Sequence, residues 1–201
     1  MTITTLPRAN DTNLEQKLLL PRNYSWQEFV VLENLLASSG SFRITYLDGW
    51  IELMTVGEPH ELIKKSLAIL LEAYFIEMEI EFIPVGNATR RGEEKGTSFE
   101  PDESYYLGAK KANPDLAIEV ILTSGSLEKL EKYRRFKIPE VWLWENNQLY
   151  VYTLISSEYR LVNRSQLLPD LDLELLVRCV QMPSRLEAMN AFKAGMRQSL
   201  G

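Results

Sequence analysis

One carboxylate lies on the apolar face of a predicted strand. Residues 116–122 form a short apolar run rich in Ile and Val between two turn signals, which is typical of a buried strand. Glu119 shares the period-2 face of Ala117 and Ile121, where an apolar side chain is expected. Because burial of an unpaired carboxylate is costly, we expect Glu119 to be protonated, paired or bound to a cation.

The helix predicted after this strand carries a lysine on its apolar side. At about 100° per residue, one broad arc of this helix holds Leu127, Leu130, Tyr133 and Phe136. Lys129 falls on that arc between Tyr133 and Phe136, whereas Lys132 and Arg135 fall outside it. The inward acid and the inward lysine can form a structural ion pair, the lysine can reach solvent, or the two can belong to a site.

Two further acids precede this strand in Pro-Asp pairs, Asp102 after Pro101 and Asp115 after Pro114. Proline favours extended backbone in its neighbour, so each aspartate can lie where a strand begins or bends. An aspartate and a glutamate on adjacent strands can hold Mg²⁺ for phosphodiester hydrolysis. A nearby lysine would then orient or deprotonate the attacking water, or stabilise charge on the phosphorane. Asp102 is the first candidate, and Asp115 competes with it.

Composition narrows the class of protein and the type of metal. The 201 residues fit one domain and, with 45% apolar and 25% charged residues, a soluble globular protein. No apolar run reaches membrane length and no secretory signal is visible, so we expect a cytoplasmic protein without a membrane segment. A single cysteine, Cys179, and a single histidine, His60, exclude a zinc site rich in either residue, so any metal takes oxygen ligands. The net charge of −6 argues mildly against a large nucleic-acid footprint.

Patterning predicts an α/β or α+β fold with a mixed central sheet flanked by helices. Helices are expected over 25–37, 60–79 and 126–136 and after residue 165, and strands over 42–47, 50–54, 81–85, 98–107, 116–122, 141–145, 149–154 and 159–162. Ser25 and Glu28 form a capping box, and Asp48-Gly49 predicts a tight hairpin. Glu52 is expected to face solvent, and Trp142 and Trp144 to lie in the core or on a sheet face.

Six motifs in order resemble the PD-(D/E)XK nuclease superfamily, and more closely its Uma-two type restriction endonuclease family. They lie between residues 25 and 154 and read Tyr46-Leu47-Asp48-Gly49-Trp50-Ile51-Glu52-Leu53-Met54, Pro59-His60-Glu61, Glu100-Pro101-Asp102-Glu103-Ser104-Tyr105-Tyr106, Pro114-Asp115-Leu116-Ala117-Ile118-Glu119-Val120, Lys129-Leu130-Glu131-Lys132-Tyr133 and Ile138-Pro139-Glu140-Val141-Trp142-Leu143. The resemblance implies a restriction-endonuclease-like core. We therefore expect a flexible lead-in over 1–22, that core domain over 23–164, and a C-terminal helical extension over 165–201 packed on the same domain.

The resemblance also implies roles for individual residues. Asp102 and Glu119 match the two metal ligands. The lysine that the superfamily places two residues after the second acid is replaced by Ile121, and Lys129 matches the lysine that this branch carries on the next helix, with Lys132 as its rival. Glu61 matches a helical glutamate of the superfamily, and His60 beside it can face the same cleft.

These expectations together describe an Mg²⁺- or Mn²⁺-dependent DNA endonuclease that works as a homodimer. The acidic net charge and the isoleucine at position 121 leave a second hypothesis open, a nuclease-derived binding or assembly module without activity. A metal-dependent hydrolase of a non-nucleic phosphoester is a third.

Overall fold

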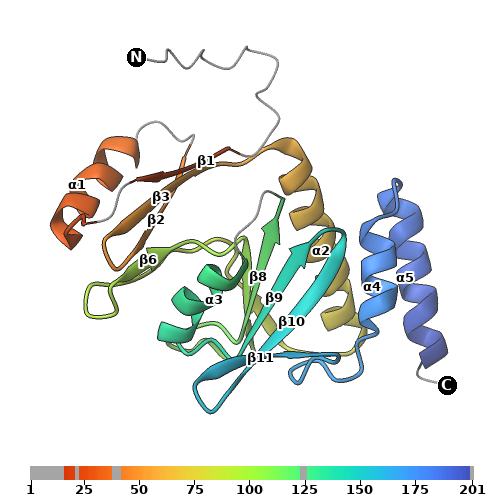
Figure 1. The fold of residues 1–201 in the computed structure, drawn as a ribbon. Helices are drawn as coiled ribbons and strands as arrows, with labels where there is room; N and C mark the ends of the chain where they lie inside the picture. The colour runs from red at the N-terminus through yellow and green to blue at the C-terminus, as the bar shows by residue number, and fades with distance from the viewer. Residues whose placement is uncertain (1–15, 21–22, 38–41, 123–125, 200–201) are drawn as a thin grey trace.

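A computed structural model describes residues 16–20, 23–37, 42–122 and 126–199 (Figure 1). The strands are β1 Gln16–Leu20, β2 Arg43–Leu47, β3 Trp50–Thr55, β4 Phe82–Pro84, β5 Arg90–Gly92, β6 Thr97–Phe99, β7 Glu103–Leu107, β8 Leu116–Ile121, β9 Glu140–Glu145, β10 Gln148–Ile155 and β11 Glu158–Val162. The helices are α1 Trp26–Ala37, α2 Glu58–Glu77, α3 Ser126–Arg135, α4 Leu173–Val180 and α5 Arg185–Ser199. Within these ranges, no helix has the length and apolar character needed to cross a membrane.

The larger sheet has the strand order β11-β10-β9-β8-β7-β4. β8 and β9 are parallel and the other pairs are antiparallel, so the predicted mixed sheet flanked by helices is confirmed. Successive side chains of β8 point to opposite faces of the sheet and enter two different hydrophobic cores. Ile118 and Val120 pack in the cluster shared by α2, α4 and α5, whereas Ala117 and Ile121 pack beneath α3 (Figure 1). Glu119 therefore points to the α3 side.

A smaller sheet of order β1-β3-β2-β6-β5 was not anticipated as a separate layer. The aromatic and aliphatic residues Phe29, Tyr46 and Ile51 bury one of its faces against α1. Five residues of the predicted lead-in, Gln16–Leu20, form β1 along β3, so the expectation of a loose segment is wrong for them. They alternate poorly, which explains why sequence alone did not indicate a strand. The rest of the lead-in, residues 1–15 and 21–22, lies outside the described residues.

The two local signals at the start of the chain are confirmed. The Ser25 N–H donates to Glu28 Oε2 at 2.7 Å and the Glu28 N–H donates to Ser25 Oγ at 3.2 Å, which is a capping box. Asp48 and Gly49 adopt φ values of 46° and 87°, as a tight turn between β2 and β3 requires. The turn fixes a register in which Thr45 lies opposite Glu52 and Arg43 lies opposite Met54.

An arginine on α3 fastens the smaller sheet to the rest of the protein. Arg135 Nη1 and Nη2 donate to the two carboxylate oxygens of Asp48 at 2.7 and 2.5 Å, and Nη1 also donates to the Lys95 carbonyl at 2.6 Å. Gly96 lies against this contact with φ +59°, and a Cβ there would come within 2.6 Å of Asp48 Oδ1. A glycine is thus required for both conformation and space.

We expect the Asp48–Arg135 contact to weaken in acid. Hydrogen bonding from Arg135 lowers the pKa of Asp48 below its ordinary value, against the opposing effect of burial. A lowered carboxyl pKa contributes stability that is present above the unfolded-state value, about 3.8–3.9, and is lost as the pH falls through the folded-state value. Urea unfolding of wild type and Asp48→Asn from pH 7 to pH 2.5 should show a wild-type advantage that shrinks below about pH 4. A constant difference across that range would contradict the prediction.

Candidate active site

The backbone brings Asp102 and Glu119 to adjacent positions on neighbouring strands. β7 pairs with β8 with Glu103 opposite Ile118, and the Asp102 N–H donates to the Ile118 carbonyl at 3.1 Å. Asp102 directly precedes β7, and its Oδ2 accepts from the Val120 N–H, so Asp102 lies beside the part of β8 that carries Glu119. Their side chains are almost completely buried, since only 1% of Asp102 and 4% of Glu119 is exposed. Pro101 lies between β6 and β7, and Asp102 directly precedes β7, in agreement with the expectation that this aspartate lies where a strand begins or bends.

Asp102 is surrounded by donors. The Val120 N–H donates to Oδ2 at 2.7 Å, and Arg43 Nη1 donates to Oδ1. His60 Nε2 lies 3.1 Å from Oδ2, although the ring is turned away from ideal hydrogen-bond geometry. Burial would raise the pKa of Asp102, but the contact with His60, the charge of Arg43 and the Val120 N–H together hold it well below the ordinary value. The carboxylate is therefore ionised at neutral pH.

Glu119 is positioned by a phenol from α3. Tyr133 Oη donates to Glu119 Oε1 at 2.5 Å, and both groups are buried. Burial and the charge of Glu119 raise the pKa of Tyr133 well above its ordinary value, so the phenol stays protonated and acts as a donor. Glu119 lines a small cavity between the two sheets together with Arg43, Thr45, Glu52, Met54, Glu100 and Lys132.

The lysine that the structure places in this cavity is Lys132, with 6% exposure. Its Nζ lies 5.9 Å from the centre of the Phe99 ring on β6. The expectation that Lys132 lies outside the buried side of the helix is therefore wrong. Because α3 packs against β6 as well as against the larger sheet, more of its surface is buried than its apolar residues indicate, and Lys132 lies in the added part. The backbone of Lys129 belongs to α3, but its side chain lies outside the described residues.

Glu61 and His60 lie at the start of α2 on the rim of this site. The Glu61 side chain is 40% exposed, and its Oε1 lies 3.7 Å from Arg43 Nη2. Lys64 Nζ donates to Glu61 at 2.7 Å. Arg43 therefore contacts Glu61 with one nitrogen and Asp102 with the other. His60 is fully buried and faces Asp102 directly, whereas Glu61 is linked to Asp102 through Arg43.

Asp115 is not part of this cluster. Its carboxylate accepts a hydrogen bond from the Leu107 N–H at 2.9 Å and from Lys111 Nζ at 2.6 Å. It precedes Glu119 by four residues of extended chain, or roughly 13 Å. The structure therefore places the Asp115 carboxylate in a separate set of contacts from that of Asp102.

Sequence reasoning missed Arg43 and misplaced Glu52. Both were treated as ordinary residues of a hairpin, with Glu52 facing solvent, yet both line the cavity beside Glu119. The reason is that one face of the smaller sheet packs on α1 and the opposite face covers the larger sheet. The available signal was the alternation in β2, where Arg43 and Thr45 share a polar face opposite Ile44 and Tyr46.

The donor chemistry of the cluster suits a hard divalent cation. Asp102 and Glu119 would hold Mg²⁺ or Mn²⁺, which commonly takes one or two protein carboxylates and completes its shell with water and substrate oxygens. No group of three or more His, Cys, Asp or Glu with metal-binding geometry occurs in the described part of the chain. The two acids fit such an ion, and it would compete with Arg43 for Asp102.

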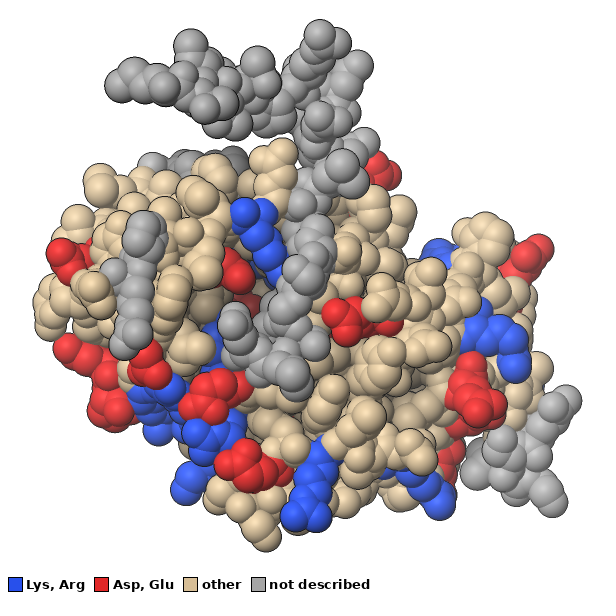
Figure 2. All heavy atoms as spheres, viewed as in Figure 1, with Lys and Arg blue, Asp and Glu red and all other residues tan. Residues whose placement is uncertain are grey.

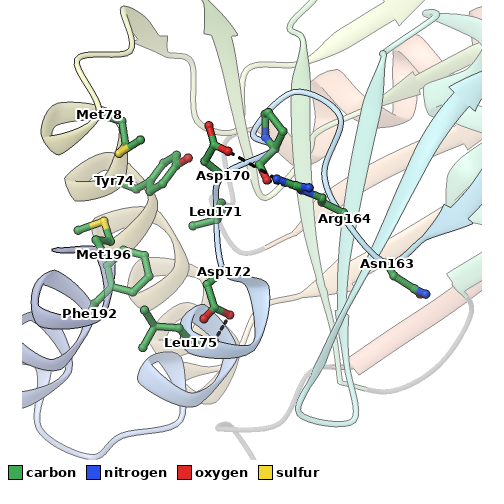
Figure 3. Close-up of a pocket in the computed structure, with 11 residues that line it drawn as sticks. Tyr74, Met78, Asn163, Arg164, Asp170, Leu171, Asp172, Leu175, Phe192 and Met196 are labelled. Carbon is green, nitrogen blue, oxygen red and sulfur yellow. Dashed lines mark hydrogen bonds and ion pairs between the residues drawn. The ribbon is translucent and has the colours of Figure 1, made fainter. Parts of the chain in front are cut away.

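A second cavity lies elsewhere, between α2, the 163–172 segment, α4 and α5 (Figure 3). Its wall is mixed, with polar residues from the 163–172 segment and apolar residues that include Met78, Phe192 and Met196. The charged residues at its mouth have local partners. Arg164 lies 3.5 Å from Asp170, and Asp172 accepts from the Leu175 N–H as the cap of α4. This cavity contains none of the residues singled out from the sequence.

Comparison with known proteins gives three results. A family model described as "Putative restriction endonuclease", Uma2, matches residues 26–184. A crystal structure titled as "a putative nuclease belonging to DUF820" from Anabaena variabilis is similar at 16% identity, with 74% of this chain and 90% of that chain covered and a TM-score of 0.45. Among curated proteins there is no match. Since the family model spans most of the chain, from α1 to the residue before α5, the protein belongs to the Uma2 family of restriction endonuclease-like proteins.

Proposed function

We propose that the protein is an endonuclease that hydrolyses phosphodiester bonds of DNA with Mg²⁺ or Mn²⁺. Family membership supports a nuclease-like function. The observation that supports the finer proposal is a cavity lined by Glu119, the buried Lys132 and Arg43, whose guanidinium also contacts Asp102.

Each side chain has a definite task in this proposal. The bound cation would activate water and offset the charge that grows on the phosphate. Asp102, ionised by its surroundings, and Glu119, oriented by Tyr133, would be its ligands. A lysine of α3 would orient the water or stabilise phosphate charge. Glu61 is a rim residue that would hold Arg43 or a water near the reacting phosphate.

The burial of Asp102 and Glu119 limits how a substrate can reach them. Asp102 and Glu119 are covered by β2 and β3, while Glu61 and Arg43 form the more exposed rim, with side chains 40% and 15% accessible. A phosphodiester must therefore enter from the side of Glu61 and Arg43. Entry also requires the smaller sheet to move relative to β8, because the cavity beside Glu119 is too small to admit a DNA strand.

The direct test is cleavage of supercoiled plasmid by the purified full chain with Mg²⁺, with Mn²⁺ and with EDTA. We expect nicked and linear products with either metal and none with EDTA. Asp115→Asn, which removes an acid outside the cluster, is the matched control and should cut like wild type. Absence of cleavage of duplex DNA, single-stranded DNA and RNA with both metals would overturn the proposal.

The second candidate is a binding or assembly module without activity. It is favoured by the net charge of −6 and by Ile121 in place of the superfamily's lysine. Basic and acidic side chains of the described residues also lie interspersed on the face in Figure 2, without a broad basic tract there. Titration calorimetry with Mn²⁺ separates the two functions. The enzyme should give a binding heat that Asp102→Asn abolishes, whereas the module should give none.

The remaining expectations are a homodimer, a cytoplasmic location and, as a third function, hydrolysis of a non-nucleic phosphoester. Activity on bis(p-nitrophenyl) phosphate without cleavage of any nucleic acid would favour that third function.

We expect Lys132→Met, and not Lys129→Met, to lower plasmid cleavage. Lys132 lies in the cavity beside Glu119, and loss of a positioned proton-transfer or charge-stabilising group typically costs 10²–10⁴-fold, so we expect roughly a 100-fold decrease. Lys129→Met should change the rate by no more than a few-fold. Both rates are measured at saturating Mg²⁺. The reverse ranking would assign the role to Lys129, as the family resemblance implies.

A further inference from the structure

One side of α2 exposes large apolar side chains at a regular interval. Leu62, Ile69 and Ile76 are 61%, 50% and 71% exposed, and each follows the last by seven residues. At about 100° per residue the three fall within an arc of roughly 40°. The opposite side of the helix packs in the main core through Leu67, Leu70, Leu71 and Tyr74.

This spacing differs from a scatter of exposed apolar residues, which is normal on protein surfaces. A seven-residue apolar repeat keeps one line of contact with a second helix if the pair winds gently in a left-handed sense. α2 is 20 residues long, so the three residues form a seam over most of its length. The seam is therefore suited to another helix with the same repeat.

We propose that this seam binds the α2 helix of a second copy of the chain, antiparallel and with the two-fold axis at Ile69. Residues at equal distances on either side of position 69 then face each other. Leu62 packs against Ile76 of the partner subunit, Ile76 packs against Leu62 of the partner subunit, and the two Ile69 side chains meet on the axis. The pattern is self-complementary, as an isologous dimer requires.

Charges beside the seam select this orientation. Lys65 and Glu72 flank the same edge of the apolar line, four residues before and three residues after Ile69. The antiparallel pairing brings Lys65 next to Glu72 of the partner subunit, and symmetry repeats the contact. A parallel two-fold pairing would instead place these edges of the two helices on opposite sides of the seam, so the contact between Lys65 and Glu72 of the partner subunit would not form.

Both flanking groups are available for this contact. The Lys65 side chain is 71% exposed, and its Nζ lies 3.5 Å from Glu103 Oε1. Glu72 accepts a hydrogen bond from Tyr105 Oη through Oε1 at 3.3 Å, and a carboxylate can accept several donors. The proposed interface consists of α2 residues alone and does not depend on whether the protein cuts DNA.

Symmetric cross-linking tests the interface and its register. In Ile69→Cys the two new thiols lie on the axis, so mild oxidation should give a covalent dimer that dithiothreitol reverses. Ile76→Cys should stay largely uncross-linked, because the two thiols would lie about 21 Å apart along the helices. The double variant Leu62→Cys/Ile76→Cys should cross-link again. The only native cysteine, Cys179, is buried and should contribute little background.

Light scattering across a concentration series completes the test. Wild type should be a dimer, and Ile69→Lys, which puts two ammonium groups on the axis, should be a folded monomer. Leu186→Lys is the matched control, since Leu186 is 72% exposed on α5, and it should remain dimeric. A monomeric wild type would overturn the proposal. So would a dimer in which Ile76→Cys cross-links and Ile69→Cys does not.

Discussion

Replacement of Glu119 by glutamine should reduce plasmid cleavage by at least about 100-fold while the protein stays folded. The amide keeps an oxygen that can accept the Tyr133 hydrogen bond, so the local packing is preserved. It removes the negative charge that would bind the cation, and the heat of Mn²⁺ binding should fall with the activity. Cleavage rates at saturating metal, calorimetry and urea unfolding measure the three quantities on one preparation.

The matched control is Glu52→Gln, which removes a charge from the same cavity but from the opposite sheet. It should retain most of the metal-binding heat, and its rate should fall much less. Equal losses in both variants would mean that the total negative charge of the cavity matters and that Glu119 has no special role. An unchanged rate in Glu119→Gln would remove Glu119 from the mechanism.

The sequence was most informative where a residue conflicted with its local pattern. Glu119 interrupts the apolar face of a strand, and that conflict alone predicted its inward position. The structure confirms that Glu119 is buried, and α3 packs on that face of the strand. The capping box at Ser25 and the turn at Asp48-Gly49 were equally readable, because each depends on contacts within a few residues. Features of this kind can be predicted from a few consecutive residues.

The parts that sequence did not reveal depend on contacts between distant segments. Lys132 appeared exposed when its helix was considered alone, and it is buried because β6 packs over that helix. The alternation of β2 placed Arg43 on a polar face, but it did not show that Arg43 contacts both Asp102 and Glu61. The alternation of polar and apolar residues in β2 and β3 does not indicate which face packs against a second sheet. That the smaller sheet covers the site could therefore be recognised only from the structure.

A different buried acid holds the second half of the fold together. Glu140 is fully buried on β9, outside the candidate active site. Trp142 Nε1 and Ser165 Oγ donate to its Oε1 at 2.7 and 2.5 Å, and the Gln166 N–H donates to its Oε2 at 2.9 Å. Thr153 Oγ1 on β10 adds a longer contact to Oε2 at 3.3 Å. One carboxylate thus ties β9 and β10 to the segment that leads into α4.

Glu140→Ala should therefore destabilise the protein by about 3–5 kcal/mol, because several buried donors lose a charged acceptor at once. Glu140→Gln should cost less, since its amide keeps one oxygen acceptor but turns an NH₂ group toward the remaining donors. Glu158→Ala, on an exposed position of β11, is the control and should change the unfolding free energy by less than about 0.5 kcal/mol. Urea unfolding followed by tryptophan fluorescence measures all three. A loss below about 1 kcal/mol in Glu140→Ala would mean that water replaces the carboxylate and that the network contributes little to the fold.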